Sequence, residues 1–109
     1  MINNVTHMLS PLQRRVLAMI AEQYVGGQSA DDALRAVPVH QLLRSIEYEV
    51  LLTRLRGLST DQRVQLKSVC GRVEHLIVSD LGAPHFGPTE RAEAYLFLVT
   101  VSDTVIPDD

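Results

Sequence analysis

The sequence predicts an all-α fold, a compact bundle of four to five helices. The chain has 109 residues, of which 46% are hydrophobic and 21% are charged, a composition typical of one compact domain. Helix start signals and glycine stops recur along it, with apolar residues at helical spacing between them. The single cysteine, Cys70, excludes a disulfide scaffold. We expect residues 10–103 to form a single helical domain, between an N-terminal arm over 1–9 and an acidic C-terminal tail over 104–109.

The first helix is predicted from Pro11 to Tyr24. Ser10 directly before Pro11 is typical of a helix N-cap followed by a proline at the first helical position. The glycine pair at 26–27 marks the stop. The apolar stripe between these signals predicts the face toward the core: Leu12, Val16, Leu17, Ile20 and Tyr24.

Two more helices are expected before the middle of the chain. Ser29 followed by Asp32 predicts a short helix through Ala36. A longer helix is predicted from Pro38 to Arg56, with Gly57 as its stop. Its helical spacing predicts a core face of Val39, Leu42, Leu43, Ile46 and Val50, and a second apolar patch of Tyr48, Leu51, Leu52 and Leu55 on the other side. A helix on the surface of a small domain does not need that second patch.

The last two helices are separated by a break rich in glycine and proline at 82–88. Ser59 with Gln62 forms a capping-box pattern that predicts a helix continuing to Leu81. Another helix is predicted to begin at Thr89. Residues 94–106 are compatible with either a helix or a strand, because they combine aromatic and branched side chains.

The fourth predicted helix carries apolar or small residues on the side away from its core face. Val64, Gly71 and Val78 are spaced by seven, and a glycine inside a helix costs about 0.5–1 kcal/mol relative to alanine. Close approach of another backbone is one reason for it. The alternative is that this helix is central and contacts neighbours on both sides. The segment 94–101 is also apolar on every side, so something must cover it.

These features predict a binding surface for another protein. Phe86, in the loop between the two prolines, is either a recognition residue or a plug at the end of the bundle. The candidate interface residues are Tyr48, Leu51, Leu52, Leu55, Val64, Gly71, Val78, Phe86, Tyr95 and Phe97.

Catalytic and metal-binding signals are weak. Cys70 lies among the predicted core residues, and Cys70 and His75 point in different directions on one helix. The glycine pair at 26–27 lacks the strand and the lysine of a phosphate-binding loop. We therefore expect no enzyme activity, no metal and no cofactor.

Nucleic-acid binding is the rival interpretation. The order helix, turn, short helix, turn, helix in the first half is similar to that of a helix-turn-helix domain. Four side chains of the helix predicted at 38–56 are of types that contact bases and phosphates: His40, Gln41, Arg44 and Tyr48. The net charge of −3 and the single lysine, Lys67, argue against it, because DNA-binding domains usually have a basic surface.

The function that we expect is therefore that of a small protein-binding regulator. It would occlude a surface of its partner, as an antiactivator or inhibitor does, for example one that acts on a transcription regulator. We also expect a homodimer through the same surface. No signal peptide or membrane-spanning stretch is recognised, which favours a cytoplasmic protein.

Overall fold

The computed structural model describes residues 7–25, 37–79 and 86–105. These residues form five helices: α1 (Pro11–Val25), α3 (Val37–Leu42), α4 (Tyr48–Arg56), α5 (Thr60–Val78) and α6 (Pro88–Thr104). An isolated antiparallel bridge between Met8 and Glu47 is the extended pairing found within them. The predicted all-α bundle is confirmed, and residues 94–104 are helical rather than extended. The short helix expected from Ser29 through Ala36 lies outside the described residues.

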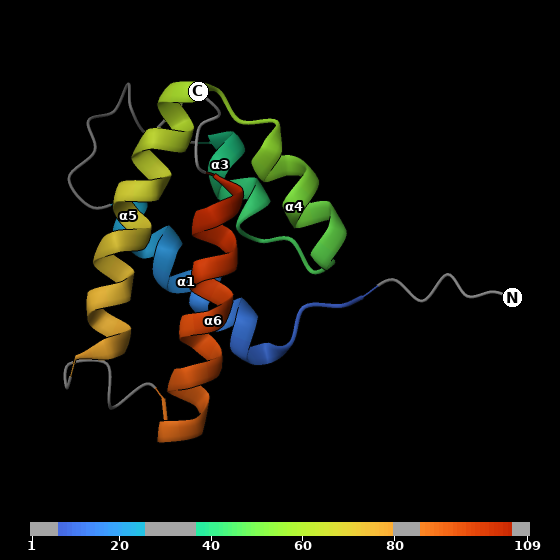
Figure 1. Cartoon of the computed structure of the whole chain (residues 1–109). Coiled ribbons are helices and arrows are strands. Elements are labelled where there is room, and N and C mark those ends of the chain that lie inside the picture. Colours follow the sequence, from blue (N-terminus) through green and yellow to red (C-terminus); the bar gives the residue numbers. More distant parts are fainter. Residues whose placement is uncertain (1–6, 26–36, 80–85, 106–109) are drawn as a thin grey trace, which may run out of the picture.

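The two longest helices form an antiparallel hairpin, in which α6 runs back along α5 (Figure 1). Helix α1 packs against both, and α4 packs against α6 with α3 beside it. The buried apolar side chains form one core cluster to which every described helix contributes. None of the described helices is long and apolar enough to cross a membrane.

Capping boxes fix the start of two helices where the sequence predicts them. At α1 the backbone N–H of Gln13 donates to Ser10 Oγ at 3.1 Å, and the N–H of Ser10 donates to Gln13 Oε1 at 2.9 Å. Ser59 and Gln62 make the same reciprocal pair at α5, at 3.2 and 3.0 Å. Helix α5 ends at Val78, earlier than the predicted Leu81, because Ser79 adopts extended backbone angles.

The prediction of one continuous helix from Pro38 to Arg56 is wrong. Helix α3 ends at Leu42 and a turn follows, in which the N–H of Ser45 donates to the Leu42 carbonyl at 3.0 Å. The chain then extends and pairs with the N-terminal arm. The Leu9 N–H donates to the Ile46 carbonyl, and the Tyr48 N–H donates to the His7 carbonyl, each at 2.8 Å. The arm thus satisfies backbone groups that a continuous helix would have paired internally.

Helix α6 begins one residue before the predicted Thr89, at Pro88. Gly87 is the N-cap, and its N–H donates to Glu90 Oε1 at 3.1 Å. A proline in the first turn suits a helix start, since its missing N–H would have had no partner there. Branched residues near the C-terminal end do not prevent helix formation, because packing of the apolar face outweighs their weaker helix propensity.

Candidate protein-binding surface

The leucines of α4 belong to the core of this chain. Leu51 and Leu55 are 0% exposed, and Leu52 is also buried. The break after Leu42 rotates α4 relative to α3, so these leucines turn inward, while Ile46, predicted to be in the core, is 48% exposed. The prediction that the α4 leucines form an exposed patch is therefore wrong. Tyr48, from the same predicted patch, is partly buried.

Two aromatic residues of the predicted interface are also buried. Phe86 lies directly before α6, and the Arg15 guanidinium sits over its ring, 5.1 Å from the centroid. Phe97 faces the core from α6. Phe86 therefore acts as the plug at the end of the bundle. The placement of Phe86 and Phe97 on a free surface is wrong.

Large apolar side chains are exposed on α6 and at the end of α5, and elsewhere at Met8, Ile46 and Val64. Leu96 is 66% exposed, Val78 is 56% exposed and Tyr95 is 37% exposed. We call this region the α6 surface, made of Val78, Ala92, Tyr95, Leu96 and Val99. Tyr95 and Val78 were predicted as interface residues. Leu96, Ala92 and Val99 are not among the predicted interface residues, although the apolar character of 94–101 was the signal for two of them.

Hollows lie on both sides of helix α6. On the α5 side there are two, which share Tyr95 and Glu74: Gly71 and Val99 line one, and Val78 and Ala92 line the other. On the opposite side a third hollow is lined by Leu96 together with residues of α1 and α4, namely Leu12, Gln13 and Tyr48. The α6 surface therefore combines hollows with apolar side chains, which suits the docking of a protein segment.

Gly71 faces open space. A Cβ placed on it would meet nothing within 4 Å, so the backbone approach expected at this residue is not made within the described chain. Helix α5 buries one face, made of Leu66, Val69, Cys70, Val73 and Ile77. Val64, like Val78, is more than half exposed. The predicted line of Val64, Gly71 and Val78 thus lies on the solvent side of α5.

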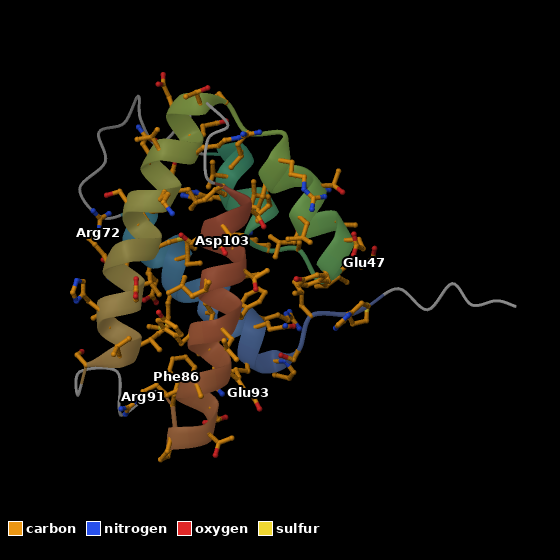
Figure 2. The ribbon with its side chains drawn as sticks, viewed as in Figure 1. Glu47, Arg72, Phe86, Arg91, Glu93 and Asp103 are labelled. Atoms are coloured by element: carbon orange, nitrogen blue, oxygen red, sulfur yellow. The ribbon has the colours of Figure 1, made fainter. Side chains whose placement is uncertain are left out.

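Charged side chains border the α6 surface. Arg91 lines the hollow at Val78, Asp103 and Lys67 line the hollow at Gly71, and Glu74 of α5 lines both. Arg91 and Asp103 lie toward opposite ends of α6 (Figure 2). The Lys67 ammonium donates to Ser102 Oγ at 3.0 Å. Within the described ranges, neither Arg91 nor Asp103 makes an ion pair. A polar rim around an apolar centre is the usual arrangement of a protein interface.

The candidate nucleic-acid residues do not share one helix. His40 is on α3, where its ring packs edge-on to Tyr24 with the centroids 5.9 Å apart. Arg44 lies in the turn after α3. Tyr48 begins α4, and its ring stacks on His7 at 5.3 Å. Of the four, Gln41 and Arg44 are exposed, so the expected row of four along one recognition helix is absent from the described structure.

Comparison with known proteins gives no assignment. No protein-family model, curated protein or solved structure matches this chain. Its function must therefore be inferred from its own residues.

The buried thiol of Cys70 is poorly suited to chemistry. Burial raises its pKa to about 12, and the nearby positive charge of Lys67 lowers it only in part. At neutral pH the thiol is therefore protonated, and a protonated thiol is a weak nucleophile and a weak metal ligand. In the part of the chain that the structure describes, no three His, Cys, Asp or Glu residues gather in a way that could hold a metal ion.

Proposed function

We propose that this protein is a small regulator that binds another protein through the α6 surface and occludes a surface of that partner. The observation that carries the proposal is that the exposed side chains of Tyr95 and Val78 line one hollow between α5 and α6, while Leu96 is exposed at the hollow on the other side of α6. Contiguous exposed apolar side chains with a polar rim mark interaction sites in soluble domains. Antiactivators and inhibitors of transcription regulators act by such occlusion, and we propose this type of function here.

An amphipathic helix is the partner element that best fits the hollow at Gly71. Its apolar side chains would lie against Gly71, Tyr95 and Val99, which line this hollow between the antiparallel helices α5 and α6. Gly71 lets a partner backbone approach α5 closely because it has no side chain. A cytoplasmic location agrees with the single free thiol of this chain.

The test compares capture by matched variants. The tagged wild-type chain, Tyr95→Asp and Arg72→Asp are each used to capture proteins from nuclease-treated lysate of the source organism. Tyr95→Asp places a charge in the centre of the α6 surface. Arg72→Asp is the control, because Arg72 is exposed on α5 and lines neither hollow on the α5 side (Figure 2). Circular dichroism confirms that each variant is folded.

We expect the wild type and Arg72→Asp each to capture one protein in an amount near-equal to their own. Tyr95→Asp should no longer capture it. Equal recovery with all three chains would show that the α6 surface is not the binding site. If material is captured only before nuclease treatment, and Arg44→Ala reduces that capture, the chain binds nucleic acid and the proposal is wrong.

A further inference from the structure

Helix α6 carries a row of four residues whose chemistry is self-complementary. Arg91, Tyr95, Val99 and Asp103 are spaced by four, so they lie along one ridge of the helix. Arg91 lines one of the two hollows on the α5 side, Val99 and Asp103 line the other, and Tyr95 borders both. The row has a cation at one end, an anion at the other and two apolar residues between them.

We propose that a second copy of this chain packs on this row, with the two α6 helices antiparallel and related by a two-fold axis that passes between Tyr95 and Val99. Antiparallel pairing places Arg91 of each copy opposite Asp103 of the other, and Tyr95 opposite Val99. The two charges are twelve residues apart on α6, which is about 18 Å along a helix. The same two contacts therefore form at both ends of the interface, as two-fold symmetry requires.

The charges select this orientation over the parallel one. In a parallel two-fold pair Arg91 would face Arg91 of the partner, and Asp103 would face Asp103 of the partner. Like charges facing one another across an interface are unfavourable. Asp103 is exposed, whereas Arg91 is partly buried with its Nε buried and unpartnered, and neither side chain forms an ion pair within the described residues. Lys67 is already hydrogen-bonded to Ser102 and flanks the row from α5.

The apolar part of the row provides the attraction. Tyr95 is 37% exposed and Val99 is partly buried. Contact with a second copy removes these side chains from water, which stabilises the pair. The open space at Gly71 gives room for the partner's side chains beside the row.

The consequence of this dimer for target binding rests on the proposed function. The dimer covers the α6 surface, so a target protein must displace the second copy before it can bind. Dimer dissociation then sets the fraction of the chain that is competent to bind its target.

Charge reversal tests the orientation directly. We would measure the mass of the wild type, Arg91→Asp and Asp103→Arg by sedimentation equilibrium over a wide range of concentration. Each single variant places like charges at both ends of the antiparallel pair, so we expect the dimer Kd to rise about tenfold or more. An equimolar mixture of the two variants restores opposite charges at both ends and should form a heterodimer. The double variant Arg91→Asp/Asp103→Arg should also dimerise, which shows that the substitutions leave the fold intact.

Arg72→Asp makes the same charge change outside the row and should dimerise like the wild type. A wild type that is monomeric at every concentration would overturn the inference, and so would single variants that dimerise normally or a mixture that does not associate. These outcomes are separate from the test of the proposed function. Capture of a target that depends on Tyr95 does not require a homodimer, so either result can hold without the other.

Discussion

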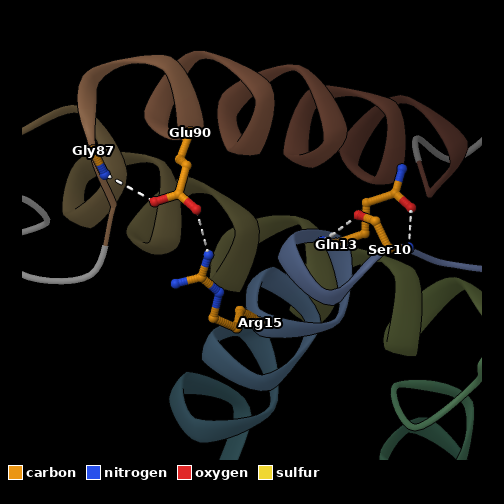
Figure 3. A network of polar contacts seen from close by, with 5 residues as sticks. All are labelled: Ser10, Gln13, Arg15, Gly87 and Glu90. Atoms are coloured by element: carbon orange, nitrogen blue, oxygen red, sulfur yellow. Dashed lines mark hydrogen bonds and ion pairs between the residues drawn. The ribbon is translucent and has the colours of Figure 1, made fainter.

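The guanidinium of Arg15 on α1 donates to Glu90 Oε2 at 2.9 Å, while Oε1 of the same carboxylate accepts the Gly87 N–H at 3.1 Å (Figure 3). One carboxylate therefore both caps α6 and ties its first turn to α1. The Arg15 side chain also covers the ring of Phe86. Together these contacts fix the start of α6 against the core, so the opposite side of the helix faces solvent.

This contact predicts a specific dependence of stability on pH. The hydrogen bond from Gly87, followed by the hydrogen bond from Arg15, lowers the pKa of Glu90. Its contribution to stability is complete above the ordinary glutamate pKa of about 4.3 and is lost as the pH falls through the lowered value. Glu90→Gln removes the charge and should show a smaller loss of stability across that interval. Urea unfolding at about pH 6 and about pH 3 measures the difference, and an identical decline in both proteins would contradict the assignment.

Leucines on α4 and α6 should respond differently to the same substitution. Leu51 is fully buried, so Leu51→Ala should lower the free energy of unfolding by about 2–5 kcal/mol. Leu96 is 66% exposed, so Leu96→Ala should change it by no more than about 0.5 kcal/mol. Chemical denaturation of the two variants checks both values. Equal effects would show that Leu51 is not a core residue.

Gly71→Ala should stabilise the folded chain. The residue lies inside α5 and a Cβ there meets nothing within 4 Å, so the gain in helix propensity is about 0.5–1 kcal/mol. A higher denaturation midpoint with an unchanged slope is the expected result. A destabilised variant would mean that some group not described here approaches Gly71 closely.

The Cys70 thiol should be unreactive in the folded protein. Because burial raises its pKa to about 12, the thiolate that reacts with disulfide reagents is scarce near neutral pH. Ellman's reagent should modify the native chain slowly and the urea-unfolded chain quickly, with one equivalent of thiol. Fast modification of the native chain would show that Cys70 is accessible.

Local signals predicted most of the helical fold. The Ser10 and Ser59 caps place the starts of α1 and α5 correctly, because capping depends on residues close in sequence. The break after Leu42 was not predicted. Beyond it the chain pairs with a segment distant in sequence, 46–48 with 7–9. No local signal in the helix predicted at 38–56 reveals that partner.

The same break explains the error at the candidate site. A continuous helix would have turned Leu51 and Leu55 away from the core face of Val39, whereas a turn between α3 and α4 lets both helices bury their leucines. At 94–101 the excess of apolar residues was a more reliable signal of exposed apolar side chains. That segment is helical, buries Phe97 and Leu98, and exposes Tyr95 and Leu96.

The most direct test of the α6 surface is to map a bound partner on the chain. The ¹⁵N-labelled protein would be titrated with the purified protein that the wild type captures, and changes in its backbone amide signals would be followed by NMR. We expect the perturbed amides to cluster around Gly71, Tyr95 and Val99. Perturbations confined to 37–56, with α6 unchanged, would contradict this expectation.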